Sequence, residues 1–296
     1  MHIKEFQKKF DIQATQDFRI SNFGLTTSSI KNTTSYATNK RYLKQALDNK
    51  NIFSIITTQD LQPLAKDKIT VISIDPLKSF YDMYHYWLEK GQKRQKVKTI
   101  ISKTATVHPS AIVSDYDVFI GENVVIEENV VIKEGVSIGN SSIIRTGTVL
   151  GCEGFHVNDL NGIYVTFRHN GFLKIGSRVE VQSLCTIDRG IFQETTIIGN
   201  NVVIGNLTQI SHNCEIGHNT VILPQATIAG SAKIGSHVYI APGAIISNVK
   251  IGDNSRVSIG SVVGSNVKKN ITVTGNFAVE HTKFLRQLFF LRKNVQ

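Results

Sequence analysis

The chain has 296 residues, of which 41% are hydrophobic and 19% charged, and its formal net charge is +10. This balance is typical of a folded globular protein and excludes an intrinsically disordered one. The basic residues are spread along the sequence without a nucleic-acid-binding motif. We therefore expect no nucleic-acid partner, and instead small polyanions such as nucleotide diphosphates, coenzyme A or an acidic carrier protein.

The N-terminal segment, residues 1–98, contains no regular repeat. Apolar runs at 52–56 and 69–74 predict strands, and Asp75-Pro76 predicts the start of a helix with Phe80, Tyr84 and Trp87 on one face. We therefore expect a small α/β domain here, which ends in a basic connector at 90–96.

The sequence contains no signal-peptide core and no apolar run long enough to span a membrane. Its three cysteines, Cys152, Cys185 and Cys214, form no C-x-x-C pair. These features lead us to expect no transmembrane segment and a reduced, cytoplasmic setting.

Residues 99–275 repeat with a period of six. An isoleucine recurs at every sixth position from Ile198 to Ile246, and the register extends upstream through Ile120 to Ile101. Neither a helix nor a single strand has this period, whereas stacked short strands with one inward side chain per hexad do. Gly and Asn at the corners, as in 199–201, tolerate positive φ. The pattern predicts a parallel β-helix.

The period is interrupted twice. Residues 151–172 form a long insertion, and such a loop leaving a compact solenoid is more often functional than idle. The spacing from Ile187 to Ile198 is 11 residues rather than 12. His156 and His169, in the insertion, are candidates for substrate contact, although loop histidines are usually exposed and have no role. We expect Cys185 and Cys214 to lie inside the solenoid. Residues 276–296 predict a short basic amphipathic helix.

Several motifs resemble the hexapeptide-repeat N-acyltransferases of the lipid A pathway. They are Thr-Ile-Asp-Arg-Gly at 186–190, Asn-Leu-Thr-Gln-Ile-Ser-His-Asn at 206–213, and Gly154-Phe155. The segment 36–42 is similar to the family's aromatic-x-x-Asn-x-x-Tyr segment, so the resemblance covers most of the chain. It implies a mainly β fold built on a left-handed β-helix, and a homotrimer with active sites between subunits. It also implies a nucleotide held by Tyr36, Asn39 and Tyr42.

Amide formation from an amino sugar and a thioester requires a base that takes a proton from the attacking nitrogen, and a neutral imidazole suits this role near pH 7. His212 matches the family's catalytic histidine, so we predict that it is the general base. The oxyanion of the intermediate needs a hydrogen-bond donor. Gly230, one 18-residue coil after His212, is our candidate for that donor.

Other segments are candidates for substrate contact. The substrate loop is Gly154-Phe155-His156. Gly275-Asn276 resembles the loop by which other hexapeptide transferases meet coenzyme A, although the proline of that loop is missing.

The chain departs from the family at two positions. Gly205 stands where the lipid A enzymes usually have an Asp, seven residues before the catalytic histidine, and Asn248 stands in place of a second histidine. The sequence therefore does not identify the side chain that orients His212, and three acids are candidates: Asp188, Glu194 and Glu215.

We interpret these departures as a change of substrate within one reaction. The leading hypothesis is an N-acyltransferase that moves a short acyl or 3-hydroxyacyl group from coenzyme A to a dTDP- or UDP-linked amino-deoxysugar for O-antigen or other surface glycans. The alternative is the UDP-3-O-(3-hydroxyacyl)glucosamine N-acyltransferase of lipid A (lipopolysaccharide) synthesis, with acyl carrier protein as donor. Both use the thioester as co-substrate and need no permanently bound cofactor.

Two other function classes stay open. A hexapeptide solenoid can be a zinc-dependent carbonic anhydrase, but His212, His218 and His237 lack a supporting spacing, so we expect no metal. The chain could also be a catalytically inactive scaffold.

Overall fold

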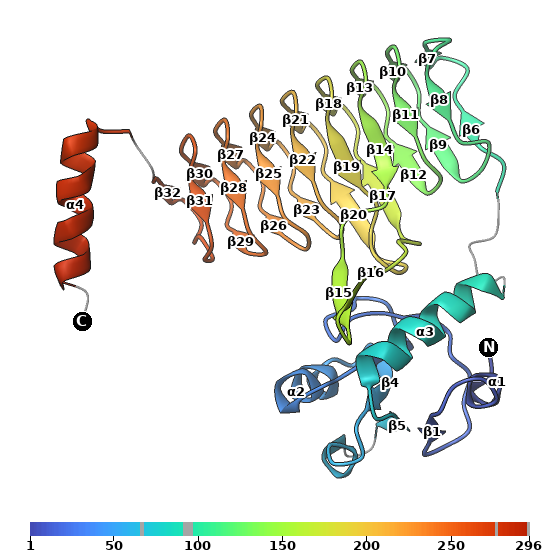
Figure 1. Ribbon diagram of the computed structural model, residues 1–296. Coiled ribbons are helices and arrows are strands. Elements are labelled where there is room, and N and C mark those ends of the chain that lie inside the picture. The colour runs from blue at the N-terminus through green and yellow to red at the C-terminus, as the bar shows by residue number, and fades with distance from the viewer. Residues whose placement is uncertain (66–67, 91–96, 276–277, 295–296) are drawn as a thin grey trace.

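The computed structural model describes residues 1–65, 68–90, 97–275 and 278–294. A long solenoid of stacked coils forms most of the molecule (Figure 1). The N-terminal domain lies beneath the middle of the solenoid, next to a hairpin that projects from it, and the C-terminal helix stands beyond its last coil.

The N-terminal domain is a five-stranded sheet in the order β1-β5-β4-β3-β2, parallel except for β1. Consecutive side chains of a strand point to opposite faces, so Ile55 packs with the core on the α2 side and Ile56 with the core on the α3 side. The elements are α1 (Ile3–Gln7), β1 (Gln13–Ala14), β2 (Asn22–Phe23), β3 (Thr33–Tyr36), α2 (Lys40–Asp48), β4 (Ile52–Thr57), a 3₁₀ turn (Gln62–Ala65), β5 (Ile69–Ile72) and α3 (Pro76–Glu89).

Helix α3 begins as the sequence predicted. The Asp75 carboxylate accepts a hydrogen bond from the Lys78 N–H at 3.0 Å, and Pro76 occupies the first turn, where no intrahelical N–H is needed. Phe80, Tyr84 and Trp87 are all buried. The expected apolar face is therefore confirmed.

Three parallel sheets form the faces of the solenoid. One contains β7 (Thr106–Val107), β10 (Val125–Ile126), β13 (Ile143–Ile144), β18 (Glu180–Val181), β21 (Val203–Ile204), β24 (Val221–Ile222), β27 (Tyr239–Ile240), β30 (Arg256–Val257) and β32 (Thr272–Val273). The second contains β8 (Ile112–Val113), β11 (Val131–Ile132), β14 (Val149–Cys152), β19 (Thr186–Asp188), β22 (Gln209–Ile210), β25 (Thr227–Ile228), β28 (Ile245–Ile246) and β31 (Val262–Val263). The third contains β6 (Ile100–Ile101), β9 (Val118–Ile120), β12 (Val136–Ile138), β17 (Phe172–Ile175), β20 (Thr195–Ile198), β23 (Glu215–Ile216), β26 (Lys233–Ile234) and β29 (Lys250–Ile251).

The isoleucine column fills the interior of this left-handed β-helix. All nine isoleucines from Ile198 to Ile246 are at most 3% exposed, and Cys185 and Cys214 are fully buried, as predicted. Burying each isoleucine contributes roughly 1.5–3 kcal/mol. Ile101 is the exception in the upstream column, with 43% exposure. It belongs to the first coil, which no earlier coil covers.

Asparagine and glycine have different roles at the corners. The left-handed conformation is taken by the third corner residue, with φ of 57° at Asn201, 56° at Asn219 and 56° at His237. Gly199 instead provides space, because a Cβ there would lie 2.8 Å from the backbone nitrogen of His218 in the next coil. Both Gly and Asn were expected to take positive φ at this corner, but only Asn201 does so, and Gly199 does not.

The expectation of a spacing shortened by one residue after Ile187 was wrong, because β19 and β20 are consecutive strands and the same step one coil later, from Ile210 to Ile216, takes six residues. The corner between Ile187 and Ile198 is therefore about five residues longer than usual, and it joins the two domains. Phe192 has φ 55° and packs edge-on against Phe80 and Tyr84 of α3, with ring centroids 5.4 and 4.9 Å apart. Phe167, at the end of the insertion, also contacts Phe80 at 5.8 Å. Edge-to-face aromatic pairs add about 0.5–1.5 kcal/mol beyond burial, so these contacts fix the N-terminal domain against the solenoid.

The insertion at 151–172 contains a hairpin, β15 (Val157–Leu160) with β16 (Ile163–Thr166), which points from the solenoid toward the N-terminal domain (Figure 1). The C-terminal helix α4 (His281–Asn294) buries none of its described side chains. Within the described residues, no helix combines the length and the apolarity needed to cross a membrane.

Candidate active site

His212 lies in the corner between β22 and β23. Ile210 points into the solenoid and Asn213 takes the left-handed conformation, φ 59°, which turns the chain into β23. The Asn213 side-chain oxygen accepts a hydrogen bond from the Ile191 N–H at 2.8 Å. The corner is therefore fixed on both sides of His212, whose side chain is 9% exposed.

Gly230 occupies the equivalent place one coil later and lies directly against the His212 ring. A Cβ at Gly230 would stand 2.7 Å from His212 Nε2 and 2.8 Å from Cε1. The Ser231 N–H donates to the His212 carbonyl at 2.8 Å and ties the two corners together. Only glycine leaves room for the imidazole in this position.

Two further histidines from the insertion surround His212. The ring centroid of His169 is 5.2 Å from that of His212 at an interplanar angle of 87°, and the His156 centroid is 5.6 Å away at 73°. His169 is 2% exposed, unlike most loop histidines. Its Nδ1 accepts a hydrogen bond from the Gly154 N–H at 3.1 Å, and this contact pulls the ring inward.

Asp188 lies behind this cluster rather than on His212. The carboxylate is 4% exposed and accepts a hydrogen bond from the Cys152 thiol at 3.0 Å. A Cβ at Gly154 would stand 2.7 Å from Asp188 Oδ2 and 2.9 Å from His169 Cε1, so Asp188 and His169 flank the same glycine. Burial raises the pKa of Asp188 and raises that of Cys152 to about 12.

The environment keeps the histidines neutral. Burial, followed by the charge of His156, lowers the pKa of His212 to about 4, although the Asn213 side chain acts in the opposite direction. Burial, followed by the charge of His212, lowers the pKa of His169 to about 3. Burial also lowers the pKa of His156. A neutral imidazole at pH 7 has the free lone pair that a general base requires.

The other two candidate acids are engaged elsewhere. Glu194 accepts hydrogen bonds from the hydroxyls of Ser28 and Ser29, at 2.5 and 2.6 Å, and thereby fastens the loop before β3 to the solenoid. Glu215 forms an ion pair with Lys233 at 2.6 Å on the outer surface. Among the described residues, no hydrogen bond joins either acid to His212.

The neighbouring Arg189 is part of a structural ion-pair cluster. Its guanidinium is 9% exposed and lies 3.1 Å from Glu153 and 3.4 Å from Glu134. These ion pairs give Arg189 a structural role at this corner.

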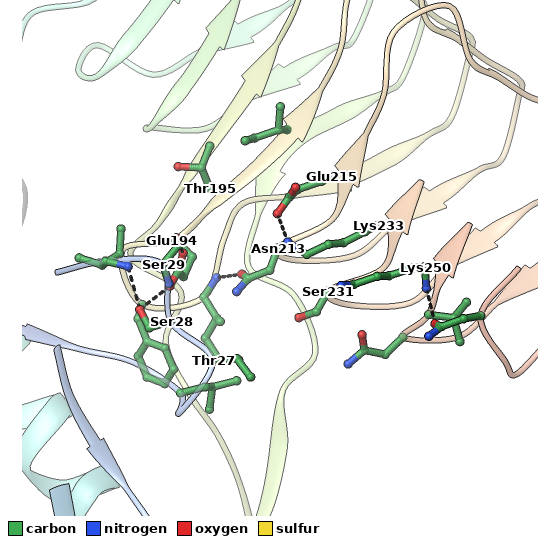
Figure 2. A pocket seen from close by; sticks show the side chains of 18 residues that line it. Thr27, Ser28, Ser29, Glu194, Thr195, Asn213, Glu215, Ser231, Lys233 and Lys250 are labelled. Atoms are coloured by element: carbon green, nitrogen blue, oxygen red, sulfur yellow. Dashed lines mark hydrogen bonds and ion pairs between the residues drawn. The ribbon is translucent and has the colours of Figure 1, made fainter. Parts of the chain in front are cut away.

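A cavity of about 460 Å³ opens beside the His212 corner. Figure 2 shows that it lies between the loop of Ser28 and Ser29 and the outer face of β20, β23, β26 and β29. Polar side chains from successive coils line one wall, namely Asn213, Ser231, Lys233, Asn248 and Lys250. Its lining combines polar and apolar side chains and includes Asn213, next to His212, and Ser231, next to Gly230.

The segment expected to bind the nucleotide lies at the start of α2. Asn39 caps that helix by accepting the Tyr42 N–H at 3.1 Å, and Tyr42 is 44% exposed. Tyr36 is half-buried against Phe80, with centroids 4.8 Å apart. Burial, followed by the nearby Tyr42, raises the pKa of Tyr36. Within the described part of this chain, no contact joins these three residues to His212.

The remaining expected substrate residues are dispersed. Phe155 is 83% exposed on the loop that leads to His156. Gly275 lies after the last strand, where its N–H donates to the Ser261 hydroxyl at 3.2 Å. Asn276 lies outside the described residues.

The three histidines considered for a zinc site, His212, His218 and His237, do not lie together in the structure. His218 and His237 sit in a different corner column from His212, where His218 Nδ1 accepts the Asn200 N–H at 2.9 Å. Among the residues that the structure describes, no group of three or more His, Cys, Asp or Glu side chains could hold a metal ion.

Comparisons with known proteins agree with this architecture. Residues 117–152, 195–230 and 215–248 match the family model for the bacterial transferase hexapeptide (six repeats). The chain is 31% identical to the UDP-3-O-acylglucosamine N-acyltransferase of Delftia acidovorans over 283 residues, which covers 88% of this chain and 83% of the relative. The protein of the same name from Rickettsia akari is 40% identical over 98 residues, covering 33% of this chain and 28% of the relative. A solved UDP-N-acetylglucosamine acyltransferase is 25% identical with a TM-score of 0.40, covering 66% of this chain and 82% of that one.

Proposed function

The chain belongs to the UDP-3-O-acylglucosamine N-acyltransferase family of hexapeptide-repeat transferases, and from this we propose that it transfers an acyl group from a thioester to the amino group of a UDP-linked 3-O-acylglucosamine. The names of the relatives favour this acceptor, the alternative drawn from the sequence, over the dTDP-linked amino-deoxysugar that led the sequence hypotheses. The test below also decides whether the acyl group comes from coenzyme A or from acyl carrier protein.

The observation that carries the proposal is the neutral His212 imidazole held against Gly230. His212 Nε2 takes a proton from the sugar nitrogen as that nitrogen attacks the thioester carbon. The carbon–nitrogen bond forms, the tetrahedral intermediate collapses, and the carbon–sulfur bond breaks as the protonated His212 gives its proton to the leaving sulfur, which releases the thiol. A backbone N–H at Gly230 is our candidate donor to the oxyanion, because this glycine lies in contact with the base.

The cavity beside His212 offers two ammonium groups to a phosphorylated substrate, although Lys233 is paired with Glu215 and Glu194 also lines the cavity. Lys233 and Lys250 are paired in register on neighbouring strands, so their side chains lie one above the other along its wall. Tyr36, Asn39 and Tyr42 are our candidates for holding the base of the nucleotide. Since no contact links them to His212 within the described part of one chain, we propose that the site is completed in a homotrimer. Exposed aliphatic side chains on the solenoid surface, including Ile112, Ile245 and Val262, support self-association.

The test is to offer purified protein two acceptors, UDP-3-O-acylglucosamine and a dTDP-linked amino-deoxysugar, each with acyl-coenzyme A and with acyl carrier protein. We expect an N-acylated UDP product, seen by mass spectrometry, that is lost in His212→Ala. Transfer to the dTDP sugar alone would replace the proposal with the earlier hypothesis. Absence of transfer in all four combinations would overturn both.

A further inference from the structure

Among the described residues, no carboxylate is hydrogen-bonded to His212, although a carboxylate usually orients a catalytic imidazole. Asp188, Glu194 and Glu215 all bind other groups. Position 205 cannot hold such an acid either, because a Cβ on Gly205 would lie 2.4 Å from the Pro224 backbone nitrogen. Yet the Nδ1 of His212 is buried and has no hydrogen-bond partner among the described residues.

The same is true of Nε2 on His169, which is also buried without a partner in the described part of the chain. The two rings are perpendicular and their centroids are 5.2 Å apart. Two unpartnered buried nitrogens on adjacent rings are costly unless something satisfies them.

The hydrogen positions follow from the contacts. His169 Nδ1 accepts the Gly154 N–H at 3.1 Å, so the neutral ring carries its hydrogen on Nε2. His212 must carry its hydrogen on the buried Nδ1 if Nε2, the nitrogen over Gly230, is to act as the base. Both of these nitrogens are then donors, and two donors cannot bond to each other. A single acceptor between them, such as a water oxygen with two lone pairs, satisfies both.

We propose that His169 is a positioning residue for His212: the two imidazoles donate to one shared buried water, which holds His212 in the tautomer whose Nε2 is free to accept the substrate's proton. This role rests on the proposed function and deepens it. Two other groups face His212. His156 packs at 5.6 Å, and the Asn213 carbonyl is already engaged by the Ile191 N–H. Burial keeps His169 itself neutral, since its pKa is lowered to about 3.

The test compares three variants with wild type. His169→Phe keeps a ring but removes the donor, His169→Gln keeps an N–H donor, and His237→Asn alters an exposed corner histidine as a matched control. We expect His169→Phe to lower kcat by about tenfold to a hundredfold with little change in KM, as expected for a misoriented base. His169→Gln should recover most of the loss, and His237→Asn should match wild type.

Nitrogen NMR of the His212 ring provides a readout that needs no substrate. We expect the Nδ1–H tautomer in wild type and in His169→Gln, and a mixture of tautomers in His169→Phe. Unchanged kcat and an unchanged tautomer in folded His169→Phe would overturn the proposal. If the wild type shows no acyl transfer at all, the proposed function fails, while the tautomer comparison still decides the role of His169.

Discussion

Gly230→Ala tests the contact on which the site depends. The new Cβ would stand 2.7 Å from His212 Nε2, whereas ordinary contact begins at 3.4 Å, so the imidazole must move by at least 3.4 − 2.7 = 0.7 Å. Backbone strain is not expected, because Gly230 is not among the positive-φ glycines. The displaced group is the end of a side chain, so the fold should adapt.

A misplacement of about 1 Å at a reacting group can cost on the order of 100-fold in rate. We therefore expect Gly230→Ala to lower kcat by about 10- to 100-fold while the melting temperature stays close to that of wild type. The assay is steady-state acyl transfer with thermal unfolding of the same samples. Gly264→Ala is the matched control, since a Cβ there meets nothing within 4 Å. Wild-type kcat in a folded Gly230→Ala protein would refute the placement of His212 against this glycine.

Three further predictions follow from the same structure. Ile222→Ala should destabilise the solenoid by about 2–5 kcal/mol in denaturant unfolding, whereas Ile163→Ala, at a position 67% exposed, should change it little. Glu194→Gln should increase hydrogen exchange in residues 25–30, because it weakens the bonds to Ser28 and Ser29; equal exchange in Glu194→Gln and wild type would contradict this. The value of kcat/KM should fall only as the pH drops through about 4, because the lowered pKa keeps His212 in its base form down to that pH; an inflection near the ordinary histidine pKa, about 6.5, would show that the site does not desolvate the ring.

The fold was predictable because each hexad repeats one physical requirement. One aliphatic side chain points inward and one residue turns the corner, so Ile198, Ile210 and Ile222 all have the same environment. The position of His212 followed from that register. Gly230 could also be anticipated, since it lies one coil after His212, although its contact with the Nε2 edge required coordinates.

The sequence showed where the six-residue period is interrupted, but not which contacts the interrupting segments make. His169 is buried by contacts with Gly154 and His212, which depend on how a long loop folds back and leave no periodic signal. Glu194 was a plausible acid for His212 by sequence, yet it binds Ser28, 166 residues away. Such contacts arise from the docking of two domains, and local patterns do not encode them.

We propose that His212 is the base for amide formation on a nucleotide-linked amino sugar. The most direct measurement is a single-turnover reaction of wild type and His212→Gln with UDP-3-O-acylglucosamine and an acyl thioester, followed by mass spectrometry of the sugar nucleotide. We predict that wild type yields the N-acylated product and that the variant, still folded and still binding the acceptor, forms it at least about a thousandfold more slowly. Product formation at the same rate in both proteins would contradict the account.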